Sequence, residues 1–144
     1  MSKKPAMMIL IGAMLAVVGM PRAAAAEMSS LGKREYDSSC ASCHGPLGKG
    51  DGPLSGYLTR KASDLTMIMR NNNGVYPFTL LSEIVDGRQS VALHGSGDMP
   101  VWGNEYNARA IEHYRDFPGA YDAESFIKAR VLALVEYIHS LQAK

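Results

Sequence analysis

Cys40-Ala41-Ser42-Cys43-His44 is the stretch of sequence from which the fold can be inferred. It contains the only two cysteines of the 144-residue chain. Two cysteines this close together cannot connect distant parts of a small secreted fold, so a disulfide framework is excluded. A structural zinc site needs about four ligands, and the chain offers no second cysteine pair. A thioredoxin-like redox pair is expected next to a βαβ pattern, which this sequence lacks.

The same five residues have the spacing at which a haem is attached covalently. The thiols of Cys40 and Cys43 can add to the two vinyl groups on one edge of a porphyrin and form thioethers. His44 then lies beside the iron and supplies the proximal imidazole nitrogen. The sequence therefore predicts one covalent haem c with its iron, in which Cys40 and Cys43 bind the cofactor and His44 binds the metal.

The sixth iron ligand must come from a distant part of the chain, and Met99 is the predicted residue. Pro100 favours an extended backbone at Met99. The nearby glycines Gly95, Gly97 and Gly103 give this loop the freedom to bring the sulfur over the iron. A thioether ligand stabilises ferrous iron relative to a second imidazole and closes the coordination sphere, which suits electron transfer.

Three alternatives to iron ligation by Met99 stay open. His94 lies five residues upstream, and a second histidine ligand would lower the reduction potential. Met67 and Met69 are weaker candidates that are expected to line the haem pocket instead. Met99 could also be an ordinary packed methionine with no bond to iron.

The amino-terminal 26 residues have the pattern of an export signal. Two lysines form a basic start, and an uncharged, mostly apolar run follows from Ala6 to Met20. Ala23–Ala26 then supplies the small residues that a signal peptidase requires. The apolar run of about 15 residues is shorter than the ~20 that cross a bilayer, and a retained membrane anchor is the alternative. We expect residues 1–26 to be a cleaved signal peptide, residues 27–144 to form one haem-binding domain, and the mature protein to lie in the periplasm.

The charge of the chain is nearly balanced, with a formal net charge of +1. Removing the three basic residues of the leader leaves 12 basic and 14 acidic side chains, a formal net charge of −2. Such a balance gives no sign of a nucleic-acid partner. Because like charges slow encounter, the docking partner is expected to present a basic or neutral surface.

Helical patterns occur both before and after the attachment motif. A first helix is expected to run to about Cys40, with Ser29 or Ser30 as its N-cap. Thr79–Asp86 predicts a second helix, because it is rich in apolar residues and Gly87 follows in the position of a helix-ending glycine. Gly45–Gly56, between these helices, is rich in glycine and proline, which indicates a loop.

The last stretch of the chain is the strongest predicted helix, capped by Asp122 or Ser125. Its apolar residues follow steps of four and three, which place them on one helical face: Ile127, Val131, Leu134, Ile138 and Leu141. No segment shows the sustained alternation of a β-strand. Helices joined by glycine-rich loops predict an all-α domain.

With these features the sequence resembles the class I cytochrome c family over most of the mature chain. Cys40–Gly45 matches the attachment motif of the family, and Met99–Gly103 resembles its distal-ligand segment. Gly50–Pro53 and Asp64–Thr66 resemble segments common in bacterial members. The resemblance implies a class I cytochrome c fold of three to five helices around one covalent haem, with crossed amino- and carboxy-terminal helices.

The family resemblance also implies how the terminal helices pack. A glycine and an aromatic residue of the first helix meet a Leu-x-x-aromatic pair of the last helix in this family. Gly32 and Tyr36 match the first pair, and Leu134 and Tyr137 match the second. Gly32 would let the two helices approach closely, since a β-carbon there would hold them apart.

Three residues around the haem follow from the same resemblance. The carbonyl of Pro53 is expected to accept a hydrogen bond from the second ring nitrogen of His44, with Pro46 as the alternative. Leu65 and Trp102 match positions that contact the haem. The Trp102 N–H is expected to bond a propionate, and ordinary core packing is the alternative.

The segment between Gly103 and Asp122 is longer than the link that the compact family pattern has there. It is charged and aromatic, and part of it could be helical. It is expected to cover one haem edge or form a docking surface, and a solvated insertion is the more ordinary alternative.

Together these features predict a soluble, exported electron carrier that is not an enzyme. Its iron would cycle between Fe(II) and Fe(III) with His44 and Met99 as axial ligands. A redox donor and a redox acceptor would dock transiently on a monomer that meets a membrane only through these partners. Two alternatives stay open: a haem c subunit of a larger dehydrogenase or oxidase, and a haem enzyme or gas sensor with a displaceable sixth ligand.

Overall fold

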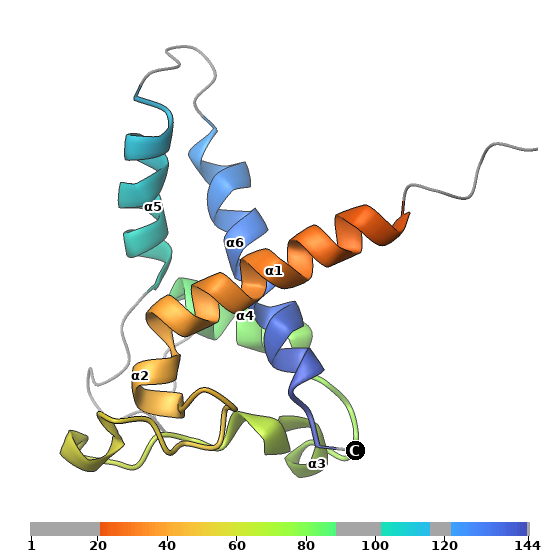
Figure 1. The fold of residues 1–144 in the computed structure, drawn as a ribbon, viewed down its shortest axis with the longest axis vertical. Helices are drawn as coiled ribbons and strands as arrows, with labels where there is room; N and C mark the ends of the chain where they lie inside the picture. Colours follow the sequence, from red (N-terminus) through yellow and green to blue (C-terminus); the bar gives the residue numbers. More distant parts are fainter. Residues whose placement is uncertain (1–20, 89–101, 116–121, 144) are drawn as a thin grey trace, which may run out of the picture.

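The computed structural model describes residues 21–88, 102–115 and 122–143. These residues contain helices and no β-strand, which confirms the predicted all-α class. The α-helices are α1 (Pro21–Ser39), α2 (Ala41–His44), α3 (Ile68–Asn71), α4 (Phe78–Asp86), α5 (Trp102–His113) and α6 (Ala123–Ser140), and the 3-10 helices are η1 (Ser55–Tyr57) and η2 (Leu65–Met67) (Figure 1). The described residues thus have six α-helices where the sequence predicted three to five, and α2 and α3 are single turns.

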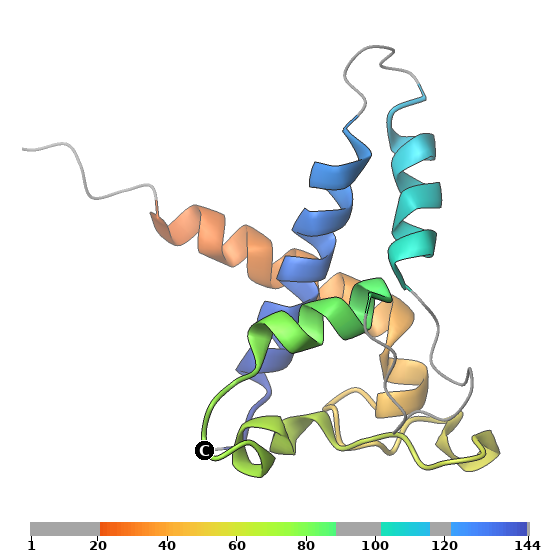
Figure 2. The same cartoon turned by 180° about the vertical axis from the view of Figure 1, so that it is seen from behind.

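The long helices α1 and α6 cross near the middle of the domain, as both views of the ribbon show (Figures 1 and 2). Gly32 lies at the crossing, where an added β-carbon would overlap the Ala133 carbonyl oxygen and lie 2.9 Å from Tyr137 Cβ. The rings of Tyr36 and Tyr137 are 5.3 Å apart, and Leu134 is fully buried between the helices. The predicted crossing is therefore confirmed, and it depends on a missing side chain.

Gly32→Ala is expected to lower the free energy of unfolding of the haem-loaded protein by about 2–3 kcal/mol, because the new methyl group forces α1 and α6 apart. Denaturant unfolding followed by far-ultraviolet circular dichroism measures this change. Gly56→Ala is the matched control, since an added β-carbon at Gly56 meets no atom within 4 Å. Equal stability of the two variants would show that the crossing tolerates a wider separation.

The amino-terminal helix differs from its predicted bounds. α1 begins at Pro21, so Ser29 and Ser30 lie inside it and the prediction that either one is its N-cap is wrong. The Ser30 hydroxyl donates instead to the Glu27 carbonyl of the same helix, at 2.8 Å. Residues 21–26 of the predicted leader lie in α1, and residues 1–20 lie outside the described part of the chain. Within the described ranges, no helix is both long and apolar enough to span a membrane.

The ends of α4 and α6 agree with the sequence. Gly87 adopts a left-handed conformation with φ 90° after α4, and its N–H donates to the Glu83 carbonyl, at 3.1 Å. The Asp122 carboxylate accepts a hydrogen bond from the Ser125 N–H at 2.9 Å. Of the two predicted caps, Asp122 is therefore the N-cap of α6.

The buried core lies where α1, α4, α5 and α6 meet. Its members are Tyr36, Cys40, Val85, Tyr106, Val131, Leu134, Val135 and Ile138. Cys40, the first residue of the attachment motif, thus belongs to the core itself. The chain from α2 through η1, η2 and α3 forms a second layer below this core in the view of Figure 1.

The end of the chain ties α6 to this second layer. The Gln142 side chain donates to the carbonyls of Leu65 (2.7 Å) and Ile138 (2.9 Å), and it accepts from the Met69 N–H at 2.9 Å. The Ala143 N–H donates to the Thr66 carbonyl at 2.9 Å. One amide side chain therefore positions the segment that contains Leu65.

Gln142→Ala is expected to lower the free energy of unfolding by about 2–3 kcal/mol, because three hydrogen bonds are lost at a half-buried position. Gln142→Glu keeps the acceptor for the Met69 N–H and loses both donors, so it should be at least as destabilising at neutral pH. Thermal unfolding of the haem-loaded variants measures both. Glu136→Ala, at an exposed position of α6, is the control and should change little.

Candidate haem-binding site

The attachment motif folds as one helical turn, α2, which follows directly after α1 in the chain. The N–H groups of Cys43 and His44 both donate to the Cys40 carbonyl, at 3.1 and 2.9 Å. Cys40 is buried and Cys43 is half-buried, and both are free thiols. Burial raises the pKa of the Cys40 thiol to about 12, so the thiol is neutral at physiological pH. A neutral buried thiol is unlike the low-pKa cysteine of a thioredoxin-like site.

The glycine-rich loop after the motif folds back onto it. Gly50 N–H donates to the carbonyl of His44 at 2.8 Å, and Gly52 N–H donates to the carbonyl of Cys43 at 3.1 Å. Leu54 N–H donates to the Ser42 carbonyl at 2.8 Å. These bonds satisfy carbonyl groups at the end of α2. Gly52 is required for this approach, because an added β-carbon would lie 2.6 Å from the Ala41 carbonyl oxygen.

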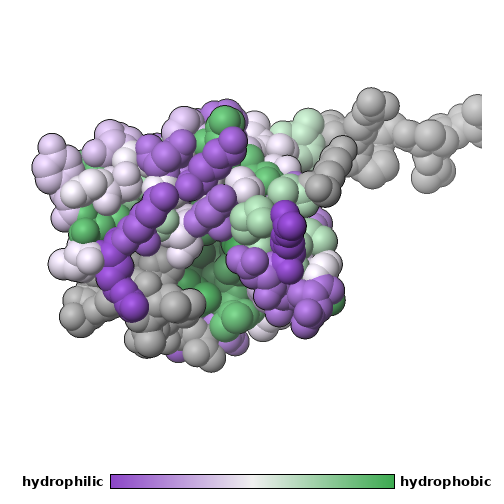
Figure 3. Space-filling view, turned by 90° about the horizontal axis from the view of Figure 1, so that it is seen from below, coloured by the Kyte–Doolittle hydropathy of each residue, from purple (hydrophilic) through white to green (hydrophobic). Residues whose placement is uncertain are grey.

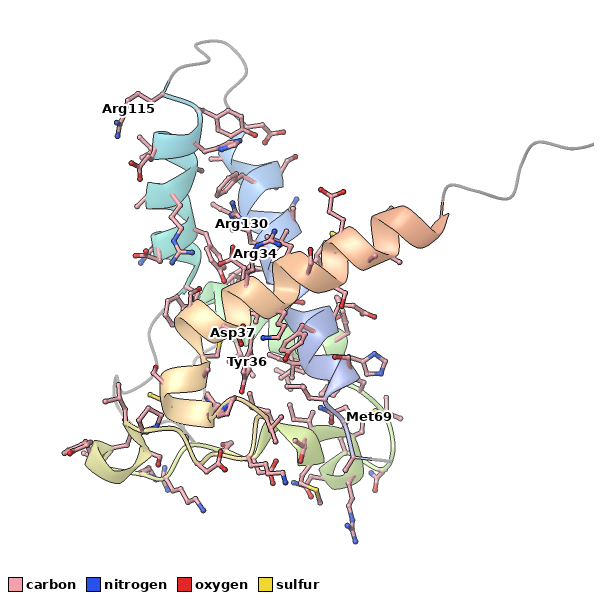
Figure 4. All side chains as sticks on the ribbon, in the orientation of Figure 1. Arg34, Tyr36, Asp37, Met69, Arg115 and Arg130 are labelled. Carbon is pink, nitrogen blue, oxygen red and sulfur yellow. The ribbon has the colours of Figure 1, made fainter. Side chains whose placement is uncertain are left out.

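Tyr36 connects the helix crossing to the motif. Its ring is fully buried, and its hydroxyl donates to the Gly45 carbonyl at 2.7 Å. In Figure 4 the Tyr36 side chain points from α1 toward the loop that follows α2. Gly45 directly follows His44, so the packing of α1 against α6 sets the position of the predicted iron ligand.

His44 is buried, and its Nδ1 lies 2.9 Å from the carbonyl oxygen of Ser63. The prediction that Pro53 or Pro46 provides this acceptor is wrong, since Ser63 takes that position and both prolines are exposed. Burial lowers the pKa of His44, and the hydrogen bond to Ser63 opposes part of this shift. The imidazole is therefore held in its neutral form, which is the form that binds metals.

The hydrogen bond to Ser63 also determines which nitrogen of His44 can bind iron. A carbonyl oxygen can only accept, so Nδ1 carries the proton. In the neutral ring Nε2 then has the lone pair, as a proximal iron ligand requires. The ring orientation and tautomer of His44, together with the two thiols of the preceding turn, fit a covalently attached haem.

The other predicted haem contacts either pack in the described part of the chain or lie outside it. Leu65 begins η2 and Trp102 begins α5, and both are half-buried and pack against the core. Met67 and Met69 are half-buried in the same layer as Leu65. Met99 and His94 lie outside the described residues. Figure 3, seen from below, shows apolar side chains in a hollow between hydrophilic ones, as a large apolar ring would need.

Comparison with known families identifies the domain. A family model described as cytochrome C oxidase, cbb3-type, subunit III matches residues 27–117, well over half of the chain. The chain belongs to this family. Its domain is a class I c-type cytochrome, so the resemblance inferred from the sequence is confirmed. Neither a curated protein nor a solved structure matches the chain.

Membership of the family assigns the chemistry of this cytochrome domain in outline. A c-type cytochrome transfers electrons through a covalently bound haem c that contains iron. In the part of the chain that the structure describes, no three histidine, cysteine, aspartate or glutamate side chains gather as a metal-ion site. In a haem the porphyrin supplies the four equatorial nitrogens, so the predicted role of His44 as an axial ligand needs no such cluster.

Two contacts of the cytochrome site could not be read from residue types. Ser63 acts through its main-chain carbonyl, which every residue possesses. The Tyr36 hydroxyl acts on the Gly45 carbonyl, whereas the sequence indicated only a helix-packing role for Tyr36. A main-chain acceptor leaves no compositional signal, so only the folded loop identifies it.

Proposed function

We propose that this cytochrome is an exported electron carrier with one haem, attached at Cys40 and Cys43 and ligated by His44 and Met99. His44 carries the proposal, because its buried ring has the tautomer in which Nε2 bears the lone pair that a metal can bind. Cleavage after residue 26, a periplasmic location and a monomeric state belong to the same proposal. Its partners would be a redox donor and a redox acceptor that dock transiently.

The protein residues serve to hold the cofactor still. The haem supplies a one-electron Fe(II)/Fe(III) couple. Cys40 and Cys43 hold one edge of the ring, and the loop that caps α2 keeps the two thiols in register. Ser63 fixes the His44 ring, and this second-sphere bond increases the basicity of the ligand nitrogen. A ligand set that does not rearrange lets electrons move with little change in structure.

A second candidate is a haem c subunit that passes electrons within a larger complex. The description of the matching family model favours it, since that description names a subunit of an oxidase. The two candidates differ in what purifies with the protein. Recovery as a free monomer from the exported fraction supports the carrier, and recovery in a stable complex with other redox subunits supports the second candidate.

Mass spectrometry and a redox titration of the purified mature protein test the proposed function. We expect the mass to increase by that of one covalent haem per chain, and the titration to show one reversible one-electron step. A wild-type protein that is exported without covalent haem would contradict the proposal. Ser42→Ala is a suitable control, because Ser42 is exposed within the motif and should not affect haem attachment.

A further inference from the structure

Three tyrosines of the described residues direct their hydroxyl groups into the protein, and two of these hydroxyls are hydrogen-bonded there. Tyr36 donates to the Gly45 carbonyl and Tyr76 donates to the Val135 carbonyl, both at 2.7 Å. The ring of Tyr106 is fully buried, yet its hydroxyl has no hydrogen-bond partner among the residues that the structure describes. A buried hydroxyl without a partner costs free energy, and phenylalanine would fill an apolar site without that cost. The hydroxyl of Tyr106 therefore calls for an acceptor.

Tyr106 is held in place by the packing of α5, which corrects the expectation of a solvated insertion. An added β-carbon at Gly103 would overlap the Asp86 carbonyl oxygen, so the start of α5 lies directly against the end of α4. Ala110, one turn after Tyr106, is also fully buried. Arg109 reaches from α5 to the Glu35 carboxylate on α1, at 3.0 Å.

Glu35 is a buried carboxylate that joins three helices. Its two oxygens pair with Arg109 of α5 at 3.0 Å and with Arg130 of α6 at 2.8 Å. Figure 4 shows Arg130 directed from α6 toward α1. These part-buried ion pairs fix α5 against α1 just before the attachment motif. They also engage both Glu35 oxygens, and no bond joins this carboxylate to the Tyr106 hydroxyl.

The surroundings of Tyr106 indicate where an acceptor would come from. Tyr106 belongs to the same core cluster as Cys40, the first residue of the attachment motif. Burial is the main cause that raises the pKa of Tyr106, and the nearby Glu35 and Cys40 raise it further. Its hydroxyl therefore keeps its proton and is a hydrogen-bond donor. Trp102 lies four residues earlier on α5, hence on the same face, and it packs against this cluster. This face of α5 therefore packs against the part of the core that contains the first residue of the attachment motif.

We propose that Tyr106 is a haem-binding residue, whose hydroxyl donates a hydrogen bond within the haem-loaded site. The proposal rests on the proposed function, since it needs a haem at Cys40 and Cys43. It gives α5 a definite role: the helix brings a hydrogen-bond donor to the cofactor, and Glu35 positions that helix. A buried donor acts strongly on a nearby redox centre, because little solvent screens it.

The reduction potential of Tyr106→Phe tests this assignment. The hydrogen of a donor carries positive partial charge, which favours the form with the extra electron. Removing it should shift the Fe(II)/Fe(III) equilibrium toward Fe(III) by a few-fold to tenfold, where tenfold corresponds to about 59 mV for one electron. We also expect a lower midpoint of thermal unfolding for the haem-loaded variant, since a satisfied hydrogen bond is lost.

Tyr76→Phe is the matched control for this experiment. It removes one part-buried phenol hydroxyl whose acceptor, the Val135 carbonyl, belongs to α6. It should lower the unfolding midpoint and leave the reduction potential unchanged. A potential that shifts only in Tyr106→Phe supports the haem contact.

An unchanged potential in haem-loaded Tyr106→Phe would overturn the proposal, whichever way the unfolding midpoint moves. The hydroxyl would then bond to an internal water. The buried Nε of Arg130, which also lacks a partner among the described residues, would be a second bonding group for that water. The covalent haem content of the wild type separates this failure from that of the proposed function. A wild type without haem overturns both, and a haem-loaded wild type with an unchanged variant potential overturns only the role of Tyr106.

Discussion

Replacing Cys40 and Cys43 together by alanine is expected to leave the chain without haem and without its native helices. Cys40 is part of the core, and Leu65 and Trp102, which are predicted haem contacts, pack against that core. Without the cofactor these apolar side chains lose their central partner. A domain of this size is stabilised by only about 5–15 kcal/mol in total, so losing the bound group can remove all of it.

Far-ultraviolet circular dichroism of the purified double variant measures the remaining helix directly. Ser42→Ala is the matched control, because it changes the exposed residue between the two cysteines and leaves both thioethers possible. The control should match the wild type in haem content and helicity. Native helicity in the haem-free double variant would refute the expectation and show that α1 and α6 stabilise the domain alone.

The sequence predicted the parts of the fold that depend on periodicity and on special residues. The family resemblance, to which Gly32 contributes, predicted the close helix crossing, and Gly87 and Asp122 predicted helix ends that the structure has. The start of α1 could not be predicted in the same way. Ser29 and Ser30 are good N-cap residues, but the alanines before them favour continuation of the helix, and the helix includes them.

The site was predictable as far as residue type carries its chemistry. Cys40, Cys43 and His44 form a motif whose own side-chain atoms would make the predicted bonds to the haem and the iron, whereas the acceptor for His44 is a main-chain carbonyl. A proline was expected there by resemblance, and the loop places Ser63 instead. The packing of α5 was also not predictable, because its buried charge pairs join residues far apart in the sequence, such as Glu35 and Arg109.

Met99→Ala is expected to leave haem attachment intact and to change the properties of the iron. The thioethers and His44 do not depend on Met99, so the variant should still load haem. Loss of a thioether ligand destabilises Fe(II) relative to Fe(III), because the thioether favours the reduced metal. The reduction potential should fall by on the order of 100 mV, within the ~0.8 V range that axial ligands set in haem proteins.

Two spectroscopic readouts assign the sixth ligand independently of the potential. The far-red absorption band of iron–methionine ligation should be present in the oxidised wild type and absent from Met99→Ala. The reduced variant should bind carbon monoxide at neutral pH, since its sixth position is open. Met67→Ala and Met69→Ala are controls that remove a half-buried methionine from the η2–α3 segment and should keep the band.

A wild type without the band would favour His94 or an open site as the sixth position of the iron. Tight carbon monoxide binding by the reduced wild type would make a haem enzyme or gas sensor the better interpretation. A band that disappears only in Met99→Ala shows that Met99 binds the oxidised iron, and a reduced wild type that does not bind carbon monoxide shows that the sixth position is also closed in Fe(II). A coordination sphere closed in both redox states is what separates an electron carrier from a haem protein that binds small ligands.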